Sequence, residues 1–123
     1  MAKPRFDDQP LIDAYGDGYF RFGAQRLEGS ILLTPNGIYP WEIASLEEAS
    51  LGTIGPLLDC AGAIDFLIVG SGTSFARWPK GLTEHLQNLR IMPDFMDTGA
   101  AARTYNVLRS EDRRVAAALI AVP

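Results

Sequence analysis

The run from Ile64 to Gly70 (IDFLIVG) constrains the fold of this 123-residue chain more than any other segment. Five of its seven residues are large and apolar, and they show little alternation with polar residues. A strand that is buried on both faces of a sheet has this pattern, and such strands are typical of parallel sheets. The segment therefore predicts a buried strand within an α/β fold.

The residues after Gly72 alternate between helical and strand patterns. Pro79 suits the first turn of a helix, and leucines recur at helical spacing from Leu82 to Leu89, which gives one apolar stripe. Residues 92–96 predict a short strand. Pro93 weakens that prediction because proline cannot donate a hydrogen bond to a sheet ladder.

A second helix and a last strand complete this half of the chain. Thr98 can cap the helix through its hydroxyl. The helix is expected to run to about Arg109, with Ala101 and Tyr105 on its inward face. Residues 115–122 (VAAALIAV) predict a buried final strand. The order strand, helix, strand, helix, strand implies parallel strands joined by right-handed crossovers.

The first third of the chain predicts antiparallel strands. Residues 19–22, 30–34 and 38–41 have strand patterns. Asn36 and Gly37 separate the last two strands, and Asn-Gly tolerates the positive φ angles of a tight hairpin turn. We expect an antiparallel meander here, followed by a short helix near Thr53.

Length and composition predict one globular domain. A chain of 123 residues is close to the commonest single-domain size, and 47% hydrophobic with 21% charged residues is an ordinary globular composition. Residues 1–14 are mostly polar, so we expect a flexible lead-in there and a single α/β domain over residues 15–122. Its predicted architecture is a central mixed sheet, with an N-terminal antiparallel β meander followed by β-α-β-α-β.

The charge pattern bears on partners and location. A formal net charge of −4 argues against nucleic-acid binding, which depends on a basic footprint. No Lys or Arg lies between Arg26 and Arg77, whereas seven follow from Arg77 to Arg114. These are either two differently solvated surfaces or a basic face that steers an acidic ligand or partner. Apolar runs are too short for a membrane span and the N-terminus lacks a secretory signal, so we expect a cytoplasmic protein.

No catalytic or metal-binding constellation stands out. Cys60 and His85 are the only cysteine and histidine, so no intrachain disulfide is possible and they cannot build a zinc site alone. We expect Cys60 to be a small buried hydrophobe and His85 to pack half-buried against the leucine stripe. Ser71 and Ser74 have no histidine base to activate them. The sequence predicts no cofactor, no metal and no catalytic residue, and it leans away from an enzyme.

The candidate site residues follow two of the predicted strands. Gly70, Ser71 and Gly72 come directly after the buried strand, and Asp97 and Thr98 follow the strand at residues 92–96. Ligands of open α/β sheets bind beyond the carboxyl ends of parallel strands, so we expect both loops on one rim. Their backbone N–H groups can hold an anion. The alternative is a turn whose glycines serve backbone geometry alone.

The helix after Asp97 offers the remaining candidates. Asp97 is a general base, an anion partner for Arg103, or a helix cap. Arg103 and Asn106 lie three residues apart on one helical face, which points at a ligand or partner or is simply solvated. Trp41 and Trp78 would anchor a partner if they are exposed, and otherwise pack in the core.

Three runs of sequence resemble one family: IDFLIVGSGTSFARWPKGL, MDTGAAARTYNVL and RRVAAALIAV. The chain is similar, over residues 15–122, to a family of small bacterial and archaeal proteins that includes the mitochondrial complex I assembly factor three and an adipogenesis-associated protein. The resemblance implies a three-layer α/β fold around a mixed sheet and no established enzymatic activity. It supplies no catalytic residues, and its matched positions are candidates only: Gly70, Ser71, Gly72, Asp97, Thr98, Arg103, Thr104 and Asn106.

Two functions remain open from the sequence. The first is a non-catalytic binding or assembly module with a protein partner, which the resemblance links to the biogenesis of a membrane-bound respiratory complex. The second is a domain that binds a nucleotide or another small anionic ligand at the strand ends, with an enzyme as one possibility. A homo-oligomer is compatible with either function.

Overall fold

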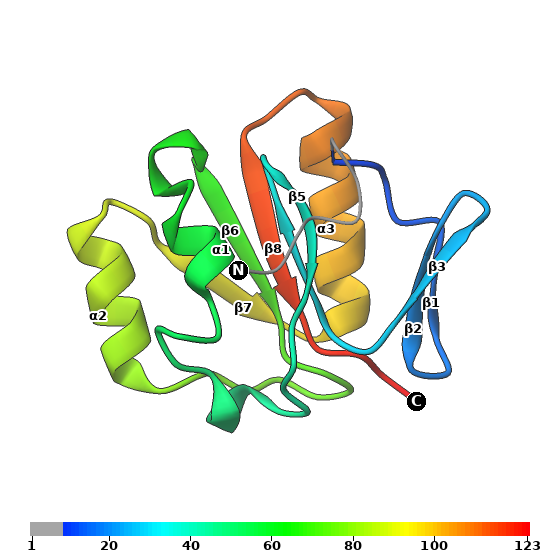
Figure 1. Ribbon diagram of the computed structural model, residues 1–123, viewed down its shortest axis with the longest axis horizontal. Coiled ribbons are helices and arrows are strands. Elements are labelled where there is room, and N and C mark those ends of the chain that lie inside the picture. Colours follow the sequence, from blue (N-terminus) through cyan, green and yellow to red (C-terminus); the bar gives the residue numbers. More distant parts are fainter. Residues whose placement is uncertain (1–8) are drawn as a thin grey trace.

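Within residues 9–123 the protein contains a five-stranded sheet, a separate three-stranded sheet and three α-helices (Figure 1). The structure in Figure 1 is a computed structural model, and it describes residues 9–123 of the chain. The strands of the large sheet are β4 (Ile31–Thr34), β5 (Gly37–Pro40), β6 (Phe66–Gly70), β7 (Pro93–Met96) and β8 (Val115–Leu119). The small sheet contains β1 (Ala14–Gly16), β2 (Tyr19–Phe22) and β3 (Gln25–Glu28), and the helices are α1 (Gly55–Leu58), α2 (Lys80–Asn88) and α3 (Thr98–Ser110). Two 3-10 turns, Leu46–Glu48 and Ala61–Ala63, connect β5 to α1 and α1 to β6.

The large sheet is mixed, with the strand order β5-β4-β8-β6-β7. Strand β6 runs parallel to both of its neighbours, β7 and β8, whereas β4 runs antiparallel to β5 and β8. The predicted fold class, an α/β domain around a mixed sheet with three parallel strands after the meander, is therefore confirmed.

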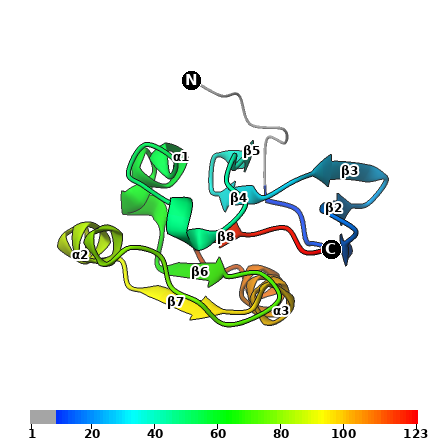
Figure 2. The same cartoon turned by 90° about the horizontal axis from the view of Figure 1, so that it is seen from below.

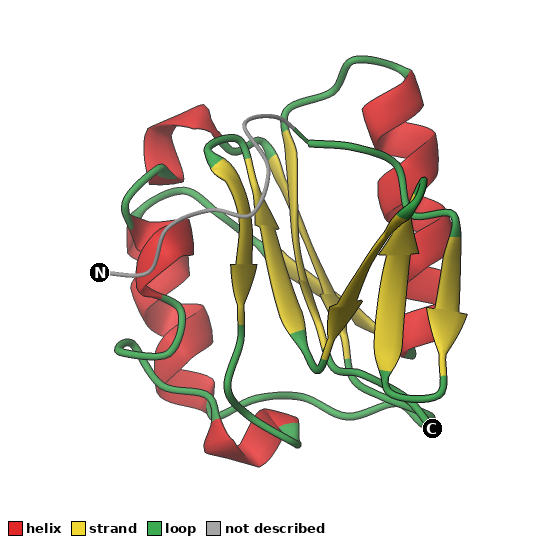
Figure 3. Ribbon diagram, turned by 45° about the vertical axis from the view of Figure 1, so that its right-hand side comes forward, coloured by secondary structure: helices red, strands yellow, loops and turns green. Residues whose placement is uncertain are grey.

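Each face of the large sheet is covered, which gives three layers (Figures 2 and 3). Helices α1 and α2 cover one face, and α3 with the small sheet covers the other. Alternate residues of β6 point to opposite faces of the sheet. Leu67 and Val69 pack toward α1 and α2, and Ile68 packs toward α3. A central strand with both faces covered needs large apolar side chains at successive positions. This explains the apolar run from Ile64 to Gly70.

The N-terminal meander is divided between the two sheets. The predicted strands at residues 19–22, 30–34 and 38–41 correspond to β2, β4 and β5, and Gly37 in the hairpin has φ +131°. However, β2 belongs to the small sheet, together with β1 and β3, which the sequence did not predict. Strand β3 has an exposed or half-buried residue at every position, so it carries no clear period-2 hydrophobic signal.

Several predicted boundaries need correction. The strand expected from Ile64 begins at Phe66, because the N–H groups of Asp65 and Phe66 both turn to the carbonyl oxygen of Arg114. The strand expected to reach residue 122 ends at Leu119. Helix α2 ends at Asn88.

The expected apolar stripe of α2 is shorter than predicted. Leu82 and Leu86 are buried, but Leu89 lies beyond the helix end and is 41% exposed. His85 is exposed, so the expectation that it packs half-buried was wrong. It lies on the solvent side of a short helix in which Leu82 and Leu86 are the two buried residues.

Residues 9–13 pack against α3. The predicted flexible lead-in covered residues 1–14, of which residues 1–8 lie outside the described part of the chain. The Tyr105 hydroxyl donates to the carbonyl oxygen of Pro10 at 2.9 Å, and the Arg109 side chain donates to that of Gln9 at 3.2 Å. Ile12 is buried under the small sheet and α3. The packed part of the protein thus reaches back at least to residue 9.

No helix within residues 9–123 has the length and apolar character needed to cross a bilayer.

Candidate functional site

The two candidate loops meet at the carboxyl ends of the parallel strands. Gly70 ends β6 and lies beside Met96, the last residue of β7, and beside Leu119, the last residue of β8. The Ser71 N–H donates to the Met96 carbonyl oxygen at 2.8 Å, and the Ile120 N–H donates to that of Gly70 at 2.9 Å. The loops after all three strands therefore share one edge of the sheet.

Thr98 joins these three loops. Its hydroxyl donates to the carbonyl oxygen of Ile120 at 2.7 Å and accepts the Gly72 N–H at 2.9 Å. Its own N–H donates to the Gly72 carbonyl oxygen at 2.9 Å. The side chain is fully buried. Thr98 thus links the strand ends through buried hydrogen bonds. Its hydroxyl and its N–H already have partners within the protein.

Asp97, and not Thr98, caps α3. The Asp97 carboxylate accepts the Ala100 N–H at 2.9 Å, which is the bond of an N-cap residue, and Thr98 is the first residue of the helix. The expectation that the Thr98 hydroxyl caps the helix was wrong. That hydroxyl turns inward to the neighbouring strand ends instead. Of the three alternatives for Asp97, the structure shows the cap.

Ser71 and Gly72 are also engaged by the protein. The Ser71 hydroxyl lies 2.6 Å from the Ser74 carbonyl oxygen and 3.1 Å from that of Met96, and it can donate to one of them at a time. Gly72 is buried and has φ +105°, a conformation that side chains rarely adopt. Its N–H is held by Thr98.

Gly70 lies where no side chain fits. A Cβ atom at this position would lie 2.9 Å from Leu119 Cδ2, 3.0 Å from Thr98 Oγ1 and 3.1 Å from Ala101 Cβ. The absence of a Cβ therefore lets the start of α3 approach the end of β6. The glycine serves close packing between helix and strand.

Arg103 and Asn106 lie farther along α3, beside the N-terminal segment. The Asn106 side-chain amide accepts the Ile12 N–H at 2.9 Å and donates to the Ile12 carbonyl oxygen at 2.8 Å. Asn106 therefore fixes this chain's own backbone. Arg103 is exposed, and with Tyr15 it lines a hollow of about 330 Å³ between α3 and β1.

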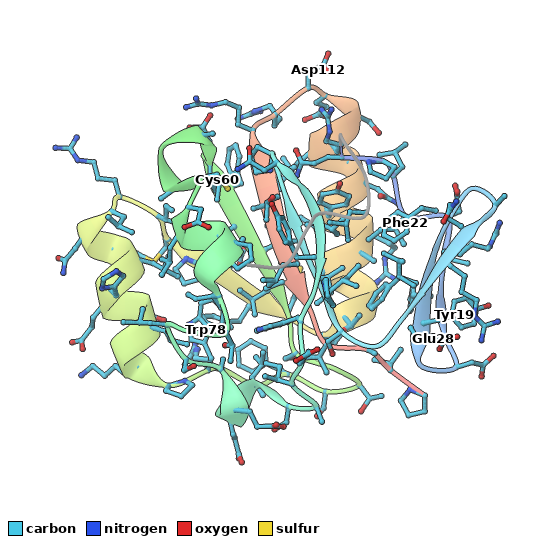
Figure 4. All side chains as sticks on the ribbon, in the orientation of Figure 1. Tyr19, Phe22, Glu28, Cys60, Trp78 and Asp112 are labelled. Carbon is cyan, nitrogen blue, oxygen red and sulfur yellow. The ribbon has the colours of Figure 1, made fainter. Side chains whose placement is uncertain are left out.

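Both tryptophans are core residues. Trp41 is 2% exposed and Trp78 is 4% exposed, so neither presents its ring to a partner. The Trp78 indole N–H donates to Thr83 Oγ1 at 3.0 Å, and its ring contacts that of Phe95 edge-on, with centroids 5.5 Å apart. Figure 4 labels Trp78 near the beginning of α2.

A groove that the sequence did not predict runs along β7. Its volume is about 550 Å³, and it lies between β7, the start of α2 and the loop before α2. The lining side chains that face solvent include Phe75, Arg77, Lys80 and Met92, with Trp78, Pro93 and Phe95 beneath them. In the sequence, Pro93 was the one indication of this open strand. Proline within a strand pattern marks an edge strand or the first residue of a strand. Pro93 is the first residue of β7, and β7 is an edge strand.

Cys60 is buried near the end of α1, as expected, and Figure 4 labels it there. Burial raises the pKa of the Cys60 thiol above its ordinary value. Because the thiolate is the reactive form, iodoacetamide at pH 8 should modify Cys60 at least about tenfold more slowly in the folded protein than in urea. Mass spectrometry of timed samples measures this. Equal rates in the two states would mean that the thiol is open to solvent.

Within residues 9–123 no group of three His, Cys, Asp or Glu side chains is placed to hold a metal ion.

The sequence matches a family model over residues 12–120, described as a protein of unknown function (DUF498/DUF598). The chain belongs to the DUF498/DUF598 family. An uncharacterised Rhodobacter capsulatus protein is 38% identical over 121 residues, covering 98% of this chain and 92% of that protein. The crystal structure of a protein described as an outer membrane protein of Bartonella henselae is 42% identical, with a TM-score of 0.91, and the match covers 96% of this chain and 99% of that one.

Other relatives of this DUF498/DUF598 chain are named for a role in assembly. The NADH dehydrogenase [ubiquinone] 1 alpha subcomplex assembly factor 3 of Xenopus tropicalis is 27% identical over 110 residues, covering 89% of this chain. The chain spans 60% of the length of that relative. The resemblance to the family that contains this assembly factor is thus confirmed.

Proposed function

We propose that this DUF498/DUF598 chain is a non-catalytic protein-binding module in the cytoplasm that assists the assembly of a membrane-bound respiratory complex. The similarity to relatives named as complex I assembly factors carries the proposal. The geometry agrees with it, because the polar groups at the strand ends are bonded to one another and exposed apolar side chains gather along β7. An exposed apolar patch with a polar rim is typical of a protein-binding surface.

The experiment is affinity purification of the tagged chain at its native level, combined with deletion of the gene. The proposal expects one defined protein partner and a reduced amount of assembled respiratory complex in the deletion strain. If the tagged chain recovers no defined partner and the deletion leaves respiratory complexes intact, the proposal fails. Light scattering of the purified chain reports separately whether it forms a homo-oligomer.

The hollow beside Arg103 favours a second candidate function, the binding of a small anionic ligand. Arg103 is exposed there, and the Tyr15 hydroxyl lies against Gly99 at the start of α3, 2.6 Å from where a Cβ on Gly99 would be. A melting-temperature screen with nucleotides, sugar phosphates and carboxylates tests it, since a ligand at a hundred times its Kd stabilises a protein by roughly 2.7 kcal/mol. A rise that is lost in Arg103→Ala supports this function. Unchanged melting temperatures at millimolar ligand reject it.

A further inference from the structure

The outer edge of β7 has backbone groups that pair with no strand of residues 9–123. Strand β7 is the last in the sheet order and pairs only with β6 within residues 9–123. The Met96 carbonyl oxygen accepts the Ser71 N–H and therefore points toward β6. Because successive residues of a strand direct their backbone groups to opposite sides, Phe95 turns its N–H and C=O outward. The backbone of Pro93 points to the same outer side. Because proline has no N–H, no hydrogen-bond donor is left without a partner there.

The most exposed apolar side chains lie along this edge. Met92 is 65% exposed and Phe75 is 59% exposed, the two largest values among the large hydrophobic side chains of residues 9–123. Both line the β7 groove. The edge-on contact between Trp78 and Phe95 supports the groove from below, so its floor is made by packed aromatic rings. The groove thus offers apolar contact area beside an open strand edge.

The charge of the groove favours an acidic occupant. Arg77 and Lys80 line it, against the single carboxylate of Asp94. The Arg77 guanidinium lies 5.3 Å from the centre of the Phe75 ring, which holds the cation at the rim. The whole chain carries a net charge of −4, so this local excess of positive charge runs against the overall balance. An acidic segment is attracted to these cations at the place where it can also pair with β7.

Two other occupants agree less well with these observations. A second copy paired symmetrically through β7 would bring two pairs of Arg77 and Lys80 together on one face of the joined sheet, and like charges repel. An anionic membrane surface would use the cations and the exposed apolar side chains but would leave the outward backbone groups of β7 unpaired. An extended polypeptide uses all three features.

We propose that the β7 groove binds an extended, acidic segment of the partner protein, which adds to the large sheet as a further strand beside β7. The inference rests on the proposed protein-binding function and names the chemistry of the partner. Alternate residues of an extended segment point to one face, so apolar side chains at every second position would pack on Phe75 and Met92. Acidic residues of the segment would then lie near Arg77 and Lys80.

The test is selection of a displayed library of random 12-residue peptides on the full-length chain. We expect enrichment of peptides that combine acidic residues with alternate apolar residues. The double variant Arg77→Glu with Lys80→Glu should bind a selected peptide at least about tenfold more weakly, because it reverses both cations of the groove. Proline placed at successive positions of the peptide should abolish binding at every second position, since strand addition needs every second N–H.

The matched control is Arg21→Glu with Arg26→Glu. These residues face each other across β2 and β3, on the side of the molecule away from α2, and the double change alters the net charge equally. The control should bind the peptide like the original protein. Equal weakening by both double variants, enrichment of basic peptides, or no enrichment overturns the proposal. Binding to phosphatidylglycerol vesicles that the groove variant alone loses, without peptide enrichment, assigns the groove to a membrane and also overturns it.

Affinity purification separates this inference from the proposed function. If the unmodified chain recovers a defined partner and the groove variant recovers it equally well, the groove proposal is wrong and the protein-binding function stands. If the unmodified chain recovers no partner and deletion of its gene leaves respiratory complexes intact, the proposed function itself fails.

Discussion

We expect replacement of Thr98 with valine to lower the free energy of unfolding by about 3 kcal/mol, although the two side chains are nearly equal in size. The hydroxyl accepts the Gly72 N–H and donates to the Ile120 carbonyl oxygen, and the side chain is fully buried. Valine leaves both backbone groups without a partner in a place that water does not reach. Each unpaired buried group costs about 1–3 kcal/mol, which sets the size of the effect.

Urea unfolding of the variant measures this loss, with an unchanged slope showing that the same surface is exposed. Thr98→Ser retains the hydroxyl and should cost about 1 kcal/mol, the value of one methyl group. Thr104→Val is the matched control, because the Thr104 hydroxyl bonds to the Ala100 carbonyl oxygen within α3. It should cost less than about 1 kcal/mol. Equal losses at the two threonines would show that Thr98 does not tie the strand ends together.

We expect replacement of Gly70 with alanine to destabilise the protein by about 2–3 kcal/mol, the cost of overpacking at a tight contact. The new Cβ would lie 2.9 Å from Leu119 Cδ2, 3.0 Å from Thr98 Oγ1 and 3.1 Å from Ala101 Cβ. The Leu119 side chain can rotate, but Ala101 can move only with α3. Relief of the clash therefore shifts the helix and strains the Thr98 hydrogen bonds.

The control for this substitution is Gly81→Ala. Gly81 is the second residue of α2, and a Cβ there meets no atom within 4 Å. Alanine should stabilise the protein by up to about 1 kcal/mol, because it favours the helix over the unfolded chain. A Gly70→Ala protein as stable as the unmodified one would mean that the close approach of β6 and α3 is not required.

The β-α-β-α-β half of the fold was predictable because its signals are local and strong. The apolar run at Ile64–Gly70 and the alternation that follows determine the parallel strands and their shared edge. The small sheet was only partly predictable, since β3 has an exposed or half-buried residue at every position and hence no clear hydrophobic period. The burial of His85 was predicted wrongly, because helical spacing alone does not show how wide a face of α2 is buried against the sheet.

The candidate site was predictable in position but not in chemistry. The sequence placed Gly70–Gly72 and Asp97–Thr98 at the ends of strands, and parallel pairing brings them together. It could not show that the Thr98 hydroxyl turns inward and bonds to both neighbouring loops, because that depends on contacts 22 and 26 residues apart. The β7 groove depends on which strand lies at the edge of the sheet, and only topology reveals this.

Amide hydrogen exchange of the free, 15N-labelled protein is the most direct test of two claims. The first is that the N–H groups at the strand ends are hydrogen-bonded within the protein, and the second is that the outer N–H groups of β7 are exposed to solvent. We expect the Gly72 N–H, which is bonded to the buried Thr98, to exchange only on extensive unfolding. We expect the Phe95 N–H, on the outer side of β7, to exchange far faster. A Phe95 N–H as protected as that of Gly72 would mean that the proposed docking edge is already covered.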